Sequence, residues 1–287
     1  MIIGLLTDLK TKNMIKVNSI SGGKTSAYMA MNYPADVELF SLVCIEADYC
    51  KPKDKGLIQY VSDKIGRDFI ATAESDKTLY VVRDLEQLLG REIKWVVGDT
   101  FEKVTKRKNG FFLPNVFNRM CTTEMKMKPI FEYCQREVGD IVEMQVGFRY
   151  DEKERGERNK DNTHFKTIIG KSENGRNKWS EIEWRTLSFP LIDDKTSHYE
   201  VYQWAQNSGL NFPSDSNCVG CFHKPFQQLR KNWDDEPQKM RWFAEMEQKA
   251  KAQWKKEMSY SSAKKIGLQT DFFFGTGSGC QAGFCTD

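Results

Sequence analysis

The sequence predicts an α/β fold: a doubly wound, mostly parallel sheet, followed by a C-terminal helical region that contains cysteines. Two observations support this prediction. Apolar stretches of strand character alternate with amphipathic helical stretches through residues 15–90, the order expected when crossover helices join parallel strands. A glycine loop at residues 21–26 also separates the first strand from the first helix, which is where such sheets bind phosphate against a helix N-terminus.

Length and composition bound the class of protein. The chain has 287 residues, enough for one large domain or a core with an appended subdomain. Its 43 basic and 40 acidic residues leave a net charge of +3, so the composition carries no global polyanion-binding signature. With no apolar run of about 18 residues and no signal-peptide cleavage site near the N-terminus, we expect a cytoplasmic protein without a membrane span. Eight cysteines then indicate metal binding or redox chemistry rather than disulfides.

The elements follow from hydrophobic periodicity. Strands are expected at residues 15–20, 37–45, 79–82, 141–147 and 183–191, and helices at 24–32, 57–65, 130–138, 198–208 and 226–256, with another opening at 85. The run 37–45 is almost continuously apolar, as in a parallel strand buried on both faces. Residues 91–128 are less regular, and the polar, glycine-containing residues 156–180 are expected to form a mobile insertion or lid. The chain then divides into an N-terminal extension (1–13), a nucleotide-binding domain (14–200) and a C-terminal helical and cysteine region (201–287).

The glycine loop is the first candidate site. It consists of Ser21, Gly22, Gly23, Lys24, Thr25 and Ser26. Adjacent glycines let the backbone approach an anion, the lysine adds a mobile charge and the hydroxyls add donors. A plain strand-to-helix turn is the alternative. Because ligands bind beyond the carboxyl ends of parallel strands, Glu46 and Asp48, which follow the second strand, are expected in the same crevice.

Positive charge marks the less regular stretch. Residues 103–108 form a basic run, which is either a solvated loop or a contact with nucleotide or nucleic-acid phosphate. Farther along, Cys121 is followed by Lys126 and Lys128. Positive charge beside a cysteine favours its thiolate, so we expect a thiolate at Cys121; a buried, unreactive cysteine is the alternative.

Charged residues follow the strand predicted at 141–147. Arg149 can clamp a phosphate through two parallel hydrogen bonds, and Asp151 and Glu152 can orient it or hold a cation. Arg155 lies just beyond. Charges directly after a strand lie at the ligand-binding edge of a parallel sheet, whereas an ordinary solvated loop is the alternative.

Cys218 and Cys221 are separated by two residues, a spacing that turns both sulfurs toward one centre. Such a pair suits zinc or an iron–sulfur cluster, and a redox dithiol is the alternative. A pair cannot fill four coordination positions, so further ligands are required. The candidates are Cys121, His223 and, in a glycine-rich C-terminal tail, Cys280 and Cys285. Spacing alone does not separate zinc from iron–sulfur.

Four motifs follow one another along the chain: the glycine loop, the cysteine and lysines at 121–128, the arginine motif at 147–155, and the Cys-x-x-Cys pair at 218–221. In this order they resemble the motifs of the PAPS reductase family, which belongs to the adenine nucleotide alpha hydrolase superfamily (the PP-loop ATP pyrophosphatases). The resemblance covers about residues 15–225 and is closest to the compact members found in phages and prophages. It implies a PP-loop that holds the pyrophosphate of ATP, with Arg149 and Arg155 facing phosphate or sulfate. It also implies a [4Fe–4S] cluster, whose ligands would include Cys121, Cys218 and Cys221.

The first functional hypothesis is an ATP pyrophosphatase coupled to sulfur transfer. ATP, with Mg²⁺, adenylates an oxygen of an acceptor, and sulfur then displaces AMP. Lys24, Arg149 and Arg155 supply electrostatic stabilisation. The cluster or a tail cysteine delivers the sulfur, and the acceptor is a nucleobase, a nucleic-acid phosphate or a small metabolite. A thioredoxin-like protein or a cysteine desulfurase is the expected donor of electrons or sulfur.

Two other hypotheses belong to different classes. A sulfonucleotide reductase would use a tail cysteine, Cys280 or Cys285, to attack the sulfate of APS or PAPS, although the intact glycine loop favours ATP. A nucleotide sensor or nucleic-acid-binding accessory protein would bind without catalysis. The oligomeric state stays open, and a homodimer is one of its options.

Overall fold

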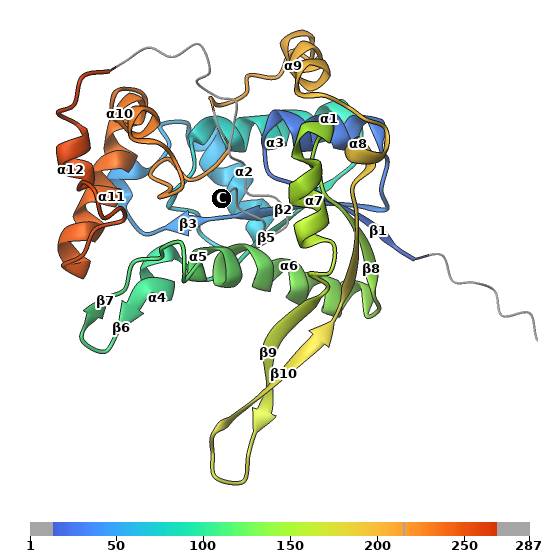
Figure 1. Ribbon diagram of the computed structural model, residues 1–287, viewed down its shortest axis with the longest axis horizontal. Coiled ribbons are helices and arrows are strands. Elements are labelled where there is room, and N and C mark those ends of the chain that lie inside the picture. Colours follow the sequence, from blue (N-terminus) through green and yellow to red (C-terminus); the bar gives the residue numbers. More distant parts are fainter. Residues whose placement is uncertain (1–13, 215, 269–287) are drawn as a thin grey trace, which may run out of the picture.

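A computed structural model describes residues 14–214 and 216–268 (Figure 1). The predicted N-terminal extension and the tail cysteines Cys280 and Cys285 lie outside the described residues. The chain forms an α/β structure around a five-stranded parallel sheet flanked by helices. The predicted α/β class with a parallel, doubly wound sheet is therefore confirmed. Within the described part of the chain, no helix is both long enough and apolar enough to cross a membrane.

The order of the strands places a topological switch point beside the first strand. β1 (Lys16–Ile20) pairs with β2 (Val37–Leu42) on one side and with β8 (Val142–Gln145) on the other. The chain continues outward from β2 to β5 (Ile93–Val97), and from β8 to β11 (Arg185–Ser188). Since the strand order reverses between β1 and β8, the loops that follow these two strands flank one crevice at the carboxyl edge, where such sheets bind ligands.

Helices cover both faces of the sheet. α1 (Lys24–Asn32), α2 (Lys55–Ile65) and α3 (Asp76–Leu89) share one buried cluster with the sheet. α6 (Lys128–Tyr133) shares the other. Alternation along β2 explains this, because successive side chains of a strand point to opposite faces: Leu39 belongs to the α6 cluster and Phe40 to the α1–α3 cluster.

Two predicted strands differ in the structure. Residues 79–82 are not a strand but part of α3, because Leu79, Val82 and Leu85 recur at helical spacing and are all fully buried. A short apolar run fits either element, and helical periodicity decides here. The third strand of this half of the sheet is β5 instead. The apolar run 37–45 also divides: β2 ends at Leu42, and β3 (Cys44–Ile45) leaves the main sheet to pair antiparallel with β4 (Ala71–Thr72).

The less regular stretches contain two hairpins. The first hairpin joins β6 (Lys106–Arg107) to β7 (Gly110–Phe111). The helix α4 (Phe101–Thr105) precedes it and α5 (Met120–Thr122) follows it. Two π-helical turns, Thr123–Met127 and Cys134–Val138, flank α6. The second hairpin follows α7 (Lys153–Asn159) and joins β9 (His164–Lys171) to β10 (Asn177–Glu183). The segment expected as an irregular insertion is therefore a regular antiparallel ribbon, which extends away from the body of the molecule in Figure 1.

The C-terminal part is helical, as predicted, but in more pieces. It comprises α8 (Pro190–Asp193), α9 (His198–Asn207), α10 (Phe226–Asp235), α11 (Pro237–Ala250) and α12 (Tyr260–Ala263). The single helix expected at 226–256 breaks at Pro237, since proline cannot continue a helix from the preceding turn.

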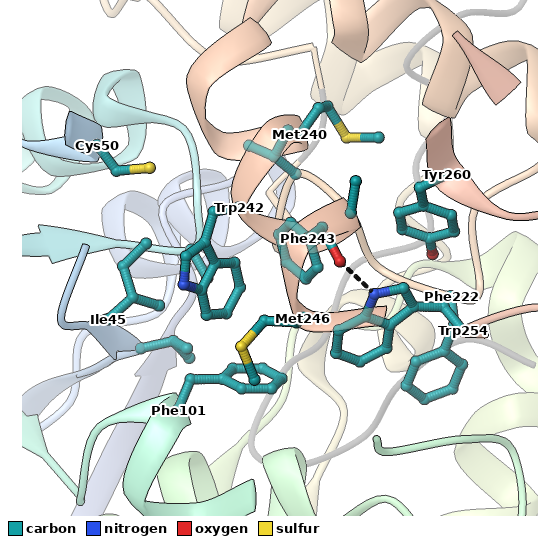
Figure 2. Close-up of a cluster of buried hydrophobic side chains, with 14 of the residues drawn as sticks. Ile45, Cys50, Phe101, Phe222, Met240, Trp242, Phe243, Met246, Trp254 and Tyr260 are labelled. Atoms are coloured by element: carbon teal, nitrogen blue, oxygen red, sulfur yellow. Dashed lines mark hydrogen bonds between the residues drawn. The ribbon is translucent and has the colours of Figure 1, made fainter. Parts of the chain in front are cut away.

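The last helices share a core with the body of the molecule. Figure 2 shows Trp242 and Phe243 of α11 packing among Phe101 and Ile45, with the indole N–H of Trp254 donating to the carbonyl of Phe243 at 2.9 Å. The helices α10–α12 thus bury an aromatic core against β3 and α4, outside the five-stranded sheet.

Candidate functional site

The glycine loop leaves β1 and closes on itself before α1. The side chain of Ser26 accepts a hydrogen bond from the backbone N–H of Ser21 and contacts its hydroxyl, both at 3.1 Å, and donates to the carbonyl of Gly23 at 3.1 Å. These two hydroxyls therefore shape the loop. α1 begins at Lys24, and its cap residue supplies no side-chain hydrogen bond. The first N–H groups of α1 and its positive dipole end thus lie at the crevice, as a phosphate requires.

Each glycine of the loop has a separate steric reason. Gly22 has a φ of +72°, and a Cβ there would lie 2.5 Å from the Cγ2 of Thr78 on α3. A Cβ on Gly23 would lie 2.7 Å from the Oγ of Ser216, in the segment that precedes Cys218. Side chains at these positions would push the loop off α3 and away from Ser216. The two glycines allow both close approaches.

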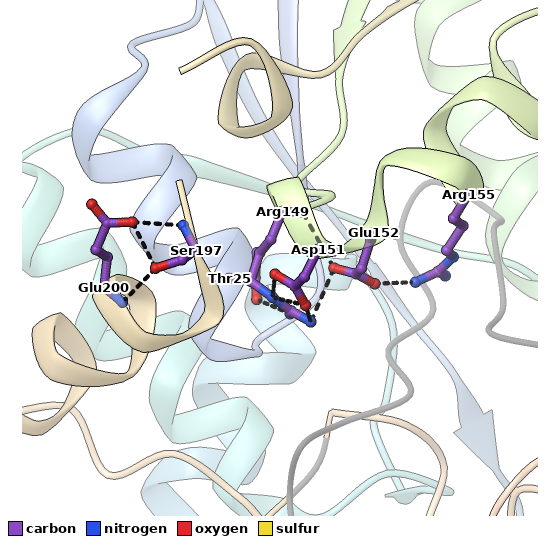
Figure 3. Close-up of polar contacts among 7 residues, drawn as sticks. All are labelled: Thr25, Arg149, Asp151, Glu152, Arg155, Ser197 and Glu200. Carbon is purple, nitrogen blue, oxygen red and sulfur yellow. Dashed lines mark hydrogen bonds and ion pairs between the residues drawn. The ribbon is translucent and has the colours of Figure 1, made fainter. Parts of the chain in front are cut away.

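Arg149 joins the two sides of the crevice. It follows β8, and its Nη1 donates to the hydroxyl of Thr25 on α1 at 3.1 Å (Figure 3). Its Nε and Nη2 donate to the two carboxylate oxygens of Asp151, at 3.2 and 3.1 Å. The arginine side chain is only 11% exposed. The face that would clamp a phosphate is therefore occupied by Asp151, and a phosphate must replace that carboxylate or bind the other N–H groups.

Glu152 positions both arginines of the motif. Its Oε2 lies 3.2 Å from the Nη2 of Arg149 and accepts the backbone N–H of Arg149, while its Oε1 accepts from Nη1 of Arg155 at 2.7 Å. The guanidinium of Arg155 also lies 4.2 Å from the ring centroid of Phe148. Burial raises the pKa of Asp151, but the hydrogen bond and charge of Arg149 outweigh it, so that pKa is lowered. Asp151 therefore stays ionised beside Arg149.

His198 is a member of this site that the sequence does not reveal. It is the first residue of α9, fixed by a capping box in which Ser197 and Glu200 bond each other's backbone (Figure 3). Burial lowers the pKa of His198, and the positive charges of Arg149 and Lys24 lower it further, against the opposing carboxylates. Lys24, Arg149 and His198 thus share one electrostatic neighbourhood with the carboxylates of Asp151 and Glu152.

Glu46 and Asp48 lie elsewhere. The carboxylate of Glu46 accepts from the hydroxyl of Thr100 at 2.7 Å and lies 3.9 Å from Lys103. Asp48 opens a 3₁₀ turn, Asp48–Cys50, which follows β3. Because the chain leaves the main sheet after β2, these carboxylates accompany β3 rather than the switch point. The structure therefore does not bring them to the glycine loop as the sequence predicted.

The thiols of Cys121, Cys218 and Cys221 (the thiol group) lie within one electrostatic neighbourhood. Burial raises the pKa of Cys218 well above its ordinary value, Glu74 raises it further, and Cys221 and Cys121 each add to the shift. Burial, followed by Cys221, raises the pKa of Cys121 to about 11. The thiolate expected at Cys121 is therefore wrong for this structure: Lys126 lowers that pKa, but burial outweighs the lysine. Lys128 instead lies 3.5 Å from Glu124.

A buried ion pair adjoins these thiols. The Nζ of Lys126 lies 2.9 Å from a carboxylate oxygen of Glu74, and the two side chains are 12% and 1% exposed. Burial lowers the pKa of Lys126, but the negative charge of Glu74 and its hydrogen bond outweigh burial, so the lysine stays charged. A charged lysine offsets the negative charge that thiolates would introduce. The sequence indicates Lys126 through its spacing from Cys121, whereas Glu74 has no such signal.

One short segment connects the two sites. Ser216 lies against Gly23 of the loop, and two residues later Cys218 belongs to the thiol group. The next residue, Val219, donates its N–H to the carbonyl of Ala73 at 2.8 Å, beside Glu74. Over residues 14–214 and 216–268, no group of three or more His, Cys, Asp or Glu side chains is arranged to hold one metal ion. Cys280 and Cys285 are outside these residues.

No protein-family model, curated protein or solved structure matches this chain. The chemistry of the site is therefore argued from its own residues and their contacts.

Proposed function

We propose that this chain is an adenine nucleotide alpha hydrolase-like enzyme of the PAPS reductase type. It binds ATP, cleaves it at the α-phosphate and couples this cleavage to sulfur transfer onto an acceptor. One observation carries the proposal: Arg149 bonds Thr25 across the switch point at 3.1 Å, so the arginine motif and the glycine loop form one anion site. The thiol group begins two residues after Ser216, which touches the same loop.

The residues at the crevice suit the pyrophosphate part of ATP. The N–H groups of the glycine loop and the N-terminus of α1 face the crevice, and Lys24 and Arg149 add two positive charges. Such donors stabilise charge that develops on a leaving group. Asp151 and Glu152 hold the arginines in place. Mg²⁺, when bound with the nucleotide, would neutralise part of the phosphate charge.

The proposed reaction has two steps. An acceptor oxygen attacks the α-phosphorus, the bond to the bridging oxygen of the β-phosphate breaks, and pyrophosphate leaves with its charge balanced by Lys24 and Arg149. A sulfide equivalent then attacks the acceptor and displaces AMP, so that one sulfur replaces one oxygen. The second step needs sulfur close to the α-phosphate, and the connection through Ser216 supplies that proximity.

The chemistry of the thiols suits the metal centre implied by the resemblance, although the described residues alone do not form a complete ligand group. Thiolates are the ligands that iron–sulfur clusters and structural zinc prefer, and Cys121, Cys218 and Cys221 supply three of them. Lys126 offsets the negative charge of such a centre. A [4Fe–4S] cluster, when bound, would supply the sulfur and electron chemistry. Because burial keeps the thiols of Cys121 and Cys218 protonated, we expect metal loading to release protons.

Turnover of ATP labelled at the α-phosphate tests this proposal. When no other acceptor is supplied, water provides the oxygen that attacks the α-phosphorus, so protein purified without oxygen should convert the labelled ATP to AMP and pyrophosphate. Lys24→Ala should slow AMP formation by about 10²-fold, the usual loss for one electrostatic donor. Lys53→Ala, an exposed lysine near α2, should not. ADP as the product would contradict the proposal, and sulfite release from APS without ATP turnover would favour a sulfonucleotide reductase instead.

A further inference from the structure

The surface at residues 103–120 carries an unusual local charge. It contains Lys103, Lys106, Arg107, Lys108 and Arg119 and no acidic residue. The whole chain, by contrast, is nearly balanced at 43 basic and 40 acidic residues. The first four basic side chains are exposed, and Lys103 lies 3.9 Å from Glu46. An exposed excess of positive charge within so short a stretch favours a polyanionic partner.

The same surface presents apolar side chains to solvent. Phe112, Val116 and Phe117 are 39%, 54% and 91% exposed. Phe117 lies in a turn closed by Asn115, whose Oδ1 accepts the N–H groups of Phe117 and Asn118, both at 3.0 Å. The backbones of Asn115 and Asn118 also bond each other. The turn therefore holds the Phe117 ring outward although the ring adds nothing to the core.

This surface adjoins the thiol group. The Nη2 of Arg107 donates to the sulfur of Met120 at 3.4 Å, and Met120 precedes Cys121. Leu113 belongs to a buried cluster, and Phe111 and Cys121 both pack against that cluster. Figure 1 shows the β6–β7 hairpin directly beside α4 and α5, the helix that carries Cys121. A strand bound here would therefore pass close to the cysteine.

We propose that residues 103–120 bind a single nucleic-acid strand. The basic side chains contact its phosphates and the exposed Phe117 ring stacks on an unpaired base, the combination used by proteins that bind single strands. An acidic polypeptide would use the charges but leave the ring without a partner. Strand binding at this surface does not depend on the proposed function. The further proposal that the bound strand is the sulfur acceptor does rest on the proposed function.

The β9–β10 ribbon offers a matched control surface. It also carries three exposed lysines, Lys166, Lys171 and Lys178. The ribbon also carries Arg176 and three glutamates, namely Glu173, Glu181 and Glu183, and Glu181 lies directly opposite Lys166 in the ladder. The charges of the ribbon nearly cancel. Removal of three lysines there changes the net charge as much as removal of Lys106, Arg107 and Lys108, but not at the proposed surface.

Fluorescence anisotropy with labelled 20-nucleotide single strands, DNA and RNA, tests the surface without ATP. The triple variant Lys106→Ala, Arg107→Ala, Lys108→Ala should bind at least about tenfold more weakly. Its slope of log affinity against log salt should be smaller by about 2, since each single-strand phosphate contact contributes about 0.7. The ribbon variant Lys166→Ala, Lys171→Ala, Lys178→Ala should bind like the wild type. Comparison of the two probes distinguishes RNA from DNA as the preferred strand.

Phe117 provides the second readout. Phe117→Ala should weaken binding by about 5- to 100-fold through loss of stacking, and Phe117→Trp should retain it. Equal loss in both triple variants, no effect of Phe117→Ala, or equal displacement of the strand by polyglutamate would overturn the proposal. Because the assay contains no nucleotide, loss of ATP turnover and loss of strand binding are separate results.

Discussion

At the scale of single residues, Arg149 controls what the crevice can bind. Its guanidinium already bonds Thr25 and Asp151, so an incoming phosphate competes with a carboxylate for the best donor face. The side chain of Asp151 is 48% exposed, and it can turn toward solvent without leaving a buried charge. We therefore expect nucleotide binding to replace the Arg149–Asp151 pair while the bond to Thr25 persists.

His198 should report phosphate binding through its pKa. In the free protein that pKa lies below its ordinary value of about 6.5. Bound phosphates add negative charge near Lys24 and Arg149, which stabilises the imidazolium, so the pKa of His198 should rise. Binding then takes up protons, and affinity should increase as pH falls through the raised pKa. NMR titration with and without α,β-methylene-ATP measures this, and His198→Gln assigns the signal.

His164 is the internal control for that titration. It lies on the β9–β10 ribbon and is exposed, so its NMR signals should not respond to the nucleotide. An unchanged pKa for His198 at saturating nucleotide would place the phosphates elsewhere.

Lys24 and Arg149 could be predicted from the sequence because of their positions relative to the predicted strands. Lys24 and Arg149 follow strands directly, and the carboxyl edge of a parallel sheet gathers such residues. The same argument failed for Glu46, because β2 ends at Leu42 and the chain turns into β3. His198 and Glu74 reach their sites only through the packing of distant elements, and neither stands in a motif.

At the scale of elements, contact between the glycine loop and α3 should be measurable as stability. Gly22→Ala adds strain at φ +72° and a Cβ 2.5 Å from the Thr78 methyl. The left-handed backbone alone costs about 1–2 kcal/mol, and the overlap should add to that. Urea unfolding should therefore show a larger loss for Gly22→Ala than for Gly66→Ala, where φ is +64° and nothing lies within 4 Å.

Thr78→Ser separates the two contributions. The serine lacks the methyl group that a Cβ at Gly22 would meet, so Gly22→Ala should cost less in the Thr78→Ser background than in the wild type. Equal losses in both backgrounds would show that α3 does not support the loop as described.

The elements that were predicted well have long periodic patterns. The predicted helix at 57–65 corresponds to α2 and the strand at 15–20 to β1, each with one consistent periodicity. The run at 79–82 is too short to decide between strand and helix from its own residues. Its assignment depends on Ser75 and Gly90, which cap α3 at its two ends.

At the scale of the whole molecule, the C-terminal helices hold the Cys-x-x-Cys turn in place. A Cβ on Gly220 would lie 2.3 Å from the ring of Phe243 on α11. The hydroxyl of Tyr260 donates to the carbonyl of Gly220 at 3.0 Å. The turn is thus packed against the aromatic core of Figure 2 on one side and linked to the glycine loop through Ser216 on the other. The helices α10–α12 thus position the Cys-x-x-Cys turn relative to the α/β body.

The central claim is that a nucleotide crevice and an iron–sulfur cluster are combined in one chain. The cysteine variants Cys121→Ser, Cys218→Ser and Cys221→Ser should each lose the centre. Cys134→Ala is the control, because Cys134 lies in the cluster around α6 and, apart from burial, only Arg185 affects its pKa.

Analysis of iron, sulfide and zinc in protein purified without oxygen tests this claim most directly. The account predicts about four irons and four sulfides per chain, as a [4Fe–4S] cluster requires, in the wild type and in Cys134→Ala but not in the three variants. A single zinc ion, or a wild type without metal, would contradict it. The function would then rest on the glycine loop and the arginine motif alone.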